Sequence, residues 1–270
     1  MGQKKHRLLF YSTWLTLALA QSASTELIAD EAYYWVYSRF PAWGYFDHPP
    51  MIGILIKSGY AIFQNELGVR LICALLSTFT ILIAESLTEK KNPYLFYTIA
   101  LSIGLLQIAG FLAVPDTPLL FFTALYFYSY RSFVNKINRQ NALLLGIAIT
   151  LLFYTKYHGL LIVVFSFLSN VKLFTRWQTW LAGFFALIFY APHLSWQWEH
   201  DWISFRYHLF ESNVSAYKFS YTTDYLLGQL LLAGPLAGFI LLPAAFIYKP
   251  NNQTEKALKF TFIGIYLIFL

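Results

Sequence analysis

The chain has 270 residues, of which 58% are hydrophobic, 20% aromatic and only 12% charged. A soluble domain carries about 25% charged residues, so this composition excludes an ordinary soluble globular protein and favours a membrane protein. The net charge of +6 is distributed in short clusters between apolar runs, which argues against a nucleic-acid-binding surface. The single cysteine, Cys73, excludes an intramolecular disulfide and a cysteine metal cluster.

Apolar runs of helical length predict an all-α, polytopic transmembrane bundle with about nine spans. The first run follows Lys4, Lys5 and Arg7, and it could also be a secretory signal, the less favoured alternative. The two runs beside Lys156 have about 15 residues each and reach about 22 Å, against a hydrocarbon core of about 30 Å. We therefore expect their connecting turn to dip below the outer surface and either to be buried in protein or to line a cavity. In chain order the predicted spans are 8–23, 67–87, 93–112, 119–134, 141–155, 159–171, 177–193, 223–248 and a last run from about 258.

Two short helices are predicted between the first and second spans. Residues 26–40 form a helix that ends before Pro41, because the residue before a proline disfavours helical geometry. Residues 51–64 are apolar but contain Lys57 and Gly59, and they are too few to cross a bilayer. We expect both helices to lie along the outer membrane surface.

The basic residues predict the orientation. The loops predicted to be cytoplasmic hold 13 of the 19 Lys and Arg residues, as the positive-inside rule requires. Ten of the 13 Asp and Glu residues lie on or near the opposite side. The chain is therefore predicted to be a multi-pass protein of the cytoplasmic membrane whose periplasmic or extracellular face uses carboxylates. Residues 1–270 are expected to form one transmembrane domain, the N-terminal part of a longer protein, because the chain ends within an apolar run.

The first outer segment holds the densest group of ionisable and aromatic side chains. Such groups are costly at a membrane boundary, so they indicate a functional site. On a helix Asp30 shares a face with Tyr33 and Tyr34, while Glu31 points about 100° away. For the tyrosines alone, an aromatic belt remains the simpler interpretation. Asp47 and His48 precede two prolines, which fix the local backbone.

Four further side chains are candidates for the same face. Asp116 opens the fourth span, and Lys156 lies in the predicted buried turn, where a charge needs an anionic partner. Arg206 is either a binding residue or an interfacial anchor. His200 belongs to a set of histidines that could bind a metal with Glu199, but their spacing is irregular, so neither a metal nor another cofactor is predicted.

Four segments together resemble glycosyltransferase family 39, bacterial membrane enzymes of the GT-C fold that include protein O-mannosyltransferases and the lipid A aminoarabinose transferase. They are the Asp30-Glu31 pair, residues 44–51 (GYFDHPPM), residues 115–119 (PDTPL) and residues 155–157 (TKY), and residues 193–205 are similar to an outer loop of the bacterial members. In such enzymes Asp30 would match an essential acid and Asp116 a second one. His48 stands where lipid A enzymes carry a lysine that contacts the donor phosphate.

The resemblance implies transfer of a sugar, with inversion, from a polyprenyl-phosphate carrier to a protein, lipid or glycan acceptor on the outer face. Phosphate is a good leaving group, so one carboxylate base suffices. Membrane lipids are further expected partners, and nucleic acid is not. The alternative is a transporter or lipid flippase, which would place ionisable groups near the bilayer midplane on broken helices. The predicted catalytic residues are Asp30, Glu31 and Asp116, and the predicted substrate-binding residues are Asp47, His48, Lys156, Tyr33, Tyr34, His200 and Arg206.

Overall fold

The computed structural model describes residues 2–88, 92–108, 110–211, 217–234 and 236–270. The described residues form helices and connecting segments, with no β-strand among them, so the all-α prediction is confirmed. The helices are α1 (Gly2–Ser24), α2 (Ala29–Arg39), α3 (Met51–Tyr60), α4 (Glu66–Leu87), α5 (Pro93–Ser102), α6 (Gly104–Ile108), α7 (Asp116–Asn135), α8 (Arg139–Phe153), α9 (Gly159–Leu168), α10 (Trp177–Glu199), α11 (Ile203–Arg206), α12 (Phe219–Leu232), α13 (Gly238–Ile247) and α14 (Gln253–Ile268). A 3₁₀ turn covers Val171–Thr175, and a π turn covers Tyr207–Glu211.

Asparagine side chains begin several of these helices. Asn65, Asn92, Asn138 and Asn252 precede α4, α5, α8 and α14, and each side-chain oxygen accepts a hydrogen bond from a backbone N–H of the first turn. A cap of this kind stabilises a helix by about 1 kcal/mol. The polar loop residues therefore determine where the apolar helices begin.

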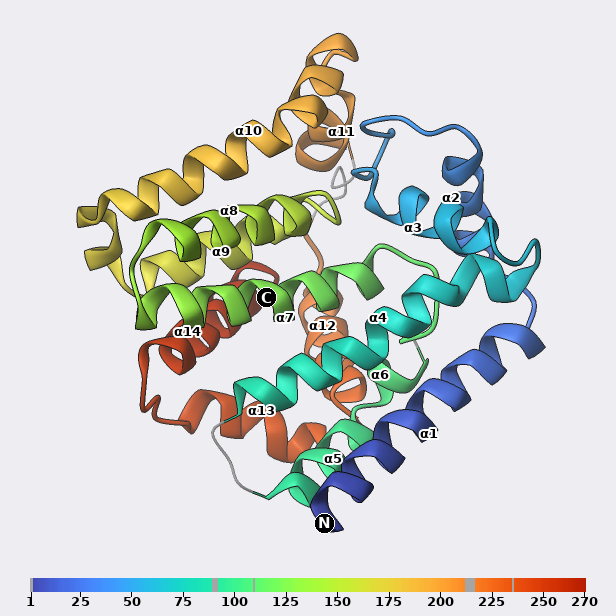
Figure 1. Ribbon diagram of the computed structural model, residues 1–270, viewed down its shortest axis with the longest axis horizontal. Coiled ribbons are helices and arrows are strands. Elements are labelled where there is room, and N and C mark those ends of the chain that lie inside the picture. Colours follow the sequence, from blue (N-terminus) through green and yellow to red (C-terminus); the bar gives the residue numbers. More distant parts are fainter. Residues whose placement is uncertain (1, 89–91, 109, 212–216, 235) are drawn as a thin grey trace.

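Five long helices pack side by side in the order α1, α4, α7, α8 and α10 (Figure 1). Helices α9 and α14 pack against each other and against α7. The aromatic side chains Tyr126, Tyr130 and Phe133 of α7 are fully buried in the largest core cluster. At one end of this layer lie α2, α3 and α11, together with the first residues of α4 and α7 and the last residues of α8 (Figure 1). We call it the α2 end.

Two predicted spans are interrupted, so the prediction of continuous helices over 93–112 and 223–248 is wrong. Helix α5 ends at Ser102 and is followed by the short α6. Helix α12 ends at Leu232, and Gly234 then adopts a φ of +102°. A Cβ atom at Gly234 would lie 2.1 Å from the carbonyl oxygen of Ser102, so close packing on α5 as well as backbone geometry requires glycine there.

Helix α4 is long and apolar enough to cross a membrane. Among the described residues it is the one helix that meets both conditions, and α3, α8, α9 and α13 are shorter apolar helices. The nine-span bundle therefore stays a prediction. In the turn between α8 and α9, Thr155 is buried and the carbonyl of Tyr154 accepts a hydrogen bond from the N–H of Met51, whereas Lys156, Tyr157 and His158 are partly exposed. The depth of this turn below a membrane surface stays a prediction.

Candidate functional site

A buried ion pair organises the α2 end. Glu31 and Arg70 are 0% and 1% exposed, and Arg70 donates from Nε to Oε1 at 2.7 Å and from Nη2 to Oε2 at 2.5 Å. The same carboxylate accepts the backbone N–H of Ile28 at 3.1 Å and that of Ala113 at 2.9 Å. The guanidinium also donates to carbonyl oxygens at the end of α1, including that of Thr25 at 2.7 Å. Both charges are thus fully hydrogen-bonded, as burial of a charge requires.

This ion pair positions two candidate acids. Asp30 immediately precedes Glu31, and Asp116 lies three residues after Ala113 at the start of α7. Because Glu31 bonds the Ala113 N–H, the first turn of α2 and the segment before α7 are fixed to each other. The predicted catalytic residue Glu31 is therefore placed as the internal support of the site, with its oxygens engaged by protein groups.

Asp30 lies in the first turn of α2 and is exposed. It makes no hydrogen bond or ion pair with the described part of the chain, so its carboxylate is available. Burial raises the pKa of the neighbouring Tyr34 hydroxyl. Three negative charges raise it further, those of Asp47, Asp30 and Asp116. The three predicted carboxylates therefore all act electrostatically on one buried tyrosine, although they come from separate segments of the chain.

Asp47 is held by two tyrosines of α2. Its Oδ1 atom accepts hydrogen bonds from Tyr37 at 2.5 Å and Tyr33 at 3.3 Å, and its Oδ2 atom lies 3.1 Å from Nδ1 of His48. Burial opposes ionisation of Asp47, but the contacts with His48 and Tyr37 outweigh it and lower the pKa of the carboxyl below its ordinary value. Asp47 is therefore an anion beside the His48 ring.

Lys156 contacts Asp116, with 2.8 Å between Nζ and Oδ1. The lysine side chain is 23% exposed and the aspartate 58%, so this pair is open to solvent, unlike Glu31–Arg70. The ion pair joins the turn after α8 to the first residue of α7. This contact supplies a carboxylate partner from the chain itself and leaves the ammonium partly accessible, and the predicted role of Lys156 in binding a donor phosphate stays a prediction.

Three histidines lie around these acids. The rings of His48 and His208 are 6.2 Å apart, and Nε2 of His208 lies 2.7 Å from the backbone oxygen of Asp47. Burial lowers the pKa of His158, and the charge of Lys156 and the nearby His208 lower it further, so His158 is neutral near pH 7. Its Nδ1 atom is buried without a hydrogen-bond partner in the described chain. Among the described residues, no group of three or more His, Cys, Asp or Glu side chains could hold a metal ion.

The segment that carries Asp47 is supported from α10 and α11. His193 of α10 is buried, and its Nδ1 atom lies 2.6 Å from the carbonyl oxygen of Trp43, so Nδ1 carries the proton. Gln197 Nε2 donates to the hydroxyls of Tyr157 and Ser204, both at 2.8 Å. Ser204 donates in turn to the Tyr45 carbonyl at 2.7 Å. This buried network connects the segment before Asp47 to the turn after Lys156.

The chain reverses between α10 and α11 at Asp201 and Trp202, which have φ values of 54° and 56°. Two consecutive left-handed residues other than glycine are strained, at about 1–3 kcal/mol each, and here they turn α11 back towards Tyr45. The predicted binding residue Arg206 lies on α11 and is exposed. His200 stacks on Trp196 with 4.1 Å between ring centroids, away from the carboxylates in its contacts.

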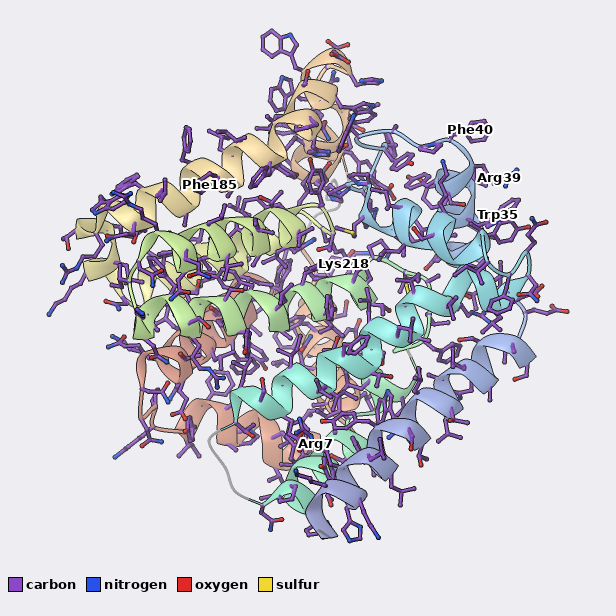
Figure 2. The ribbon with its side chains drawn as sticks, viewed as in Figure 1. Arg7, Trp35, Arg39, Phe40, Phe185 and Lys218 are labelled. Carbon is purple, nitrogen blue, oxygen red and sulfur yellow. The ribbon has the colours of Figure 1, made fainter. Side chains whose placement is uncertain are left out.

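Large side chains cover the outer edge of α2. Figure 2 shows Trp35, Arg39 and Phe40 at the edge of the molecule. Phe40 is 72% exposed, and the guanidinium of Arg39 lies 5.7 Å from the Trp35 ring. This arrangement leaves large rings and a cation exposed on the side of α2 away from Glu31 and Asp47, and the interfacial position of α2 stays a prediction.

Sequence reasoning missed Arg70. It lies one turn inside the apolar run 67–87, where a charged residue indicates a function or a partner, and this signal could have identified it. Its partner Glu31 could not have been inferred, because the two are 39 positions apart. Tyr37, Tyr157 and Gln197 were likewise not among the predicted site residues.

Residues 47–196 match the model of the family described as dolichyl-phosphate-mannose-protein mannosyltransferase. This range is more than half of the chain and contains Asp47, His48, Asp116 and Lys156. Asp30 precedes it.

Two relatives are similar to the chain. Lipid A galacturonosyltransferase RgtD of Rhizobium johnstonii is 24% identical over 276 residues, which cover 96% of this chain and 57% of the relative. An uncharacterized protein of Aquifex aeolicus is 35% identical over 96 residues, which cover 33% of this chain and 19% of the relative. The chain thus spans little more than half the length of RgtD. No solved structure matches.

Proposed function

The chain belongs to the dolichyl-phosphate-mannose-protein mannosyltransferase family of GT-C glycosyltransferases, and from this premise we propose that it is part of a polytopic membrane glycosyltransferase. Its donor is a sugar linked to a polyprenyl phosphate, and the reaction takes place at the α2 end, on the outer face of the cytoplasmic membrane. The observation that carries the proposal is the open Asp116–Lys156 ion pair, at the same end of the bundle as the exposed Asp30 of α2 and as Asp47, which two tyrosines of α2 hold. A carboxylate base and a phosphate-binding cation are what this transfer requires.

Asp30 is the proposed base. The acceptor hydroxyl oxygen attacks the anomeric carbon, its proton passes to Asp30, and the bond between that carbon and the phosphate oxygen breaks with its electrons leaving on phosphate. A single displacement of this kind inverts the anomeric centre. Of the carboxylates described here, Asp30 suits the task because it is exposed and not engaged by other protein groups.

Lys156 is the proposed partner of the donor phosphate. Its ammonium is positioned by Asp116 at 2.8 Å but is still partly accessible. The unpartnered Nδ1 of the neutral His158 and the ring of His48 lie in the same region and can contribute further donors. Asp116 thus orients the cation, and the phosphate would share or replace that contact.

For the acceptor, the similarity to RgtD is the guide. RgtD is named as a lipid A galacturonosyltransferase, so a lipid A-type acceptor is the first to test, with protein and glycan acceptors as alternatives. A transporter is not favoured. The two helix breaks, after Ser102 and after Leu232, contain no charged residue in the described chain, whereas a transporter would place its ionisable groups there.

The donor test uses membranes that contain the full-length protein. They are incubated with radiolabelled polyprenyl-phosphate sugars, one sugar at a time, with and without a lipid A acceptor, and label is followed into the acceptor fraction. We expect transfer from one sugar donor, and loss of that transfer in Asp30→Asn. Transfer from no polyprenyl-phosphate sugar, while a sugar nucleotide is consumed, would contradict the proposed donor class.

The orientation test uses single cysteines in a Cys73→Ser background. Ala61→Cys follows α3 at the α2 end, and Gln140→Cys lies in the first turn of α8 at the opposite end. Both positions are exposed. In intact cells an impermeant thiol reagent should label the first and reach the second only after lysis. The reverse pattern would contradict the outer-face site.

A further inference from the structure

A basic cavity lies at the opposite end of the bundle from the proposed active site. It has a volume of about 780 Å³ and lies between the last turn of α7 and the connection from α13 to α14. Arg131, Lys256 and Lys259 line it, and no Asp or Glu does. The nearby Glu255 is engaged elsewhere, because its carboxylate accepts the Tyr248 hydroxyl and the backbone N–H of Asn251. The cavity is therefore positively charged.

Neutral groups hold two of these cations in place. Arg131 donates to the carbonyl of Ser86 at 2.7 Å. Lys259 donates to the carbonyls of Phe246 at 2.6 Å and Tyr248 at 2.7 Å. Lys256 is exposed, and its side chain makes no hydrogen bond or ion pair with the described residues. Carbonyl oxygens orient a cation without neutralising it, so three positive charges face one cavity. Among the described residues the carboxylate beside it is that of Glu255, which contacts the lining residue Asn251, so the cations are in excess.

An apolar groove continues from the same lysines. It has a volume of about 360 Å³, shares Lys256, Lys259 and Pro250 with the basic cavity, and then follows α14 past Ile263 to Leu267. Phe165 of α9 forms its other wall. A Cβ atom at Gly264 would lie 2.4 Å from the Phe165 ring, so the glycine permits the two helices to approach at this point. The two cavities together are cationic at one end and apolar along their length.

We propose that this composite cavity binds an anionic phospholipid. The phosphate of the headgroup lies among Arg131, Lys256 and Lys259, and an acyl chain lies in the groove along α14. A free phosphate ion would leave the groove empty, and a zwitterionic lipid would bring no net charge to the cations. Basic pockets at the cytoplasmic ends of membrane helices are suited to anionic headgroups, and the basic loops of this chain are predicted to lie on that side.

This site is separate from the proposed donor site. His158, in the turn that carries Lys156, contacts Phe269 just after the last turn of α14, with 5.4 Å between ring centroids. Lys256 lies in the first turn of α14. Sixteen helical residues extend over about 24 Å, so the two anion-binding regions lie near opposite ends of one helix.

The test measures binding of phosphatidylglycerol with a fluorescent acyl chain to the full-length protein in a nonionic detergent. Phosphatidylcholine with the same label and unlabelled inorganic phosphate as competitor are the comparison ligands. Lys256→Gln should weaken phosphatidylglycerol binding about fivefold, the effect of one lysine near an anionic lipid. The matched control is Lys249→Gln, since Lys249 is also exposed and close in sequence but lines neither cavity. Ile263→Trp, which fills the groove, should weaken the binding of phosphatidylglycerol while Lys256 is unchanged.

Each alternative result would overturn the proposal. Equal affinity for the two lipids would show that charge does not select the ligand. Displacement of the lipid by inorganic phosphate at similar affinity would show an ion site without a lipid. An equal loss in the Lys249 and Lys256 variants would show attraction by the whole basic surface. Thermal unfolding of each variant separates lost binding from lost folding, and sugar transfer should persist in Lys256→Gln.

Discussion

Two clusters of charge at the α2 end differ in how completely the protein satisfies them. Glu31 and Arg70 are buried, and hydrogen bonds from side chains and backbone occupy both carboxylate oxygens. Asp116 and Lys156 form a single contact and remain open, and Asp30 makes none within the described chain. A buried carboxylate whose oxygens are all hydrogen-bonded stabilises the fold, whereas an exposed carboxylate on a well-packed helix is available to accept a proton. Adjacent acids in the sequence therefore have different tasks.

The largest expected effect is on catalysis by Asp30. Asp30→Asn keeps the shape of the side chain but removes its basicity, so sugar transfer should fall by about 10²–10⁴-fold, the usual contribution of a general base. Because Asp30 is exposed, the free energy of unfolding should change by no more than about 0.5 kcal/mol. Transfer rates and thermal unfolding of purified protein measure the two quantities. Near-normal transfer would remove Asp30 from the mechanism.

Glu31→Gln is the matched change at the next position, and it should act on stability. The substitution leaves Arg70 buried beside a neutral amide, which typically costs about 3–5 kcal/mol. Denaturant unfolding in detergent measures this loss, and transfer per folded molecule should fall much less than in Asp30→Asn. A stable Glu31→Gln protein that has lost transfer would place Glu31 in the chemistry and contradict the division between the two clusters.

Lys156→Met should raise the donor concentration needed for half-maximal transfer and slow transfer at saturation. Loss of one preorganised contact to a departing anion costs about 3 kcal/mol, or about 10²-fold in rate. Lys57→Met is the control, because Lys57 is an exposed lysine of α3 near the same end. Donor kinetics of the two variants at equal protein abundance give the comparison. Unchanged kinetics in Lys156→Met would exclude it from phosphate binding.

The smallest expected effect is the pH dependence that Asp47 contributes to stability. Its pKa is lower in the folded protein than in the unfolded chain, so its ionisation stabilises the fold fully above the ordinary value of 3.8. This contribution is lost as the pH falls from that value through the lower folded pKa. Thermal unfolding across this acid range should therefore be less pH-dependent in Asp47→Asn than in the wild type. Identical pH profiles would show that the contacts with Tyr37 and His48 do not favour the charged form.

A third charged cluster, around Glu85 in the last turn of α4, can be compared with the Glu31–Arg70 pair. Glu85 accepts the hydroxyls of Tyr11 and Tyr97, both at 3.0 Å, and pairs with Arg7 at 2.8 Å. Glu85 connects α4 to α1 and α5, and both of its carboxylate oxygens accept hydrogen bonds, as those of Glu31 do. No candidate site was predicted there from the sequence, and the contacts are those of a structural cluster.

The sequence by itself determined the helical class, most helix positions and the segment between the first two long helices as the place of the candidate acids. Apolar runs of sufficient length specify helices whatever they pack against, and Pro41 and the capping asparagines mark ends through local geometry. The breaks after Ser102 and Leu232 were not predictable. The close approach of Gly234 to Ser102 depends on packing between segments about 130 positions apart.

Only the tertiary structure decided which of the predicted site residues meet. Asp116 contacts Lys156, and Tyr33 and Tyr37 of the helix that carries Asp30 bind Asp47. The bonds of Glu31 to Ala113 and of Met51 to Tyr154 join these distant segments. The tertiary structure also gave the two neighbouring acids, which the helical pattern points about 100° apart, different surroundings, since Asp30 is exposed and Glu31 is buried. Their difference arises from Arg70, which a buried carboxylate needs as a partner and which lies on another helix.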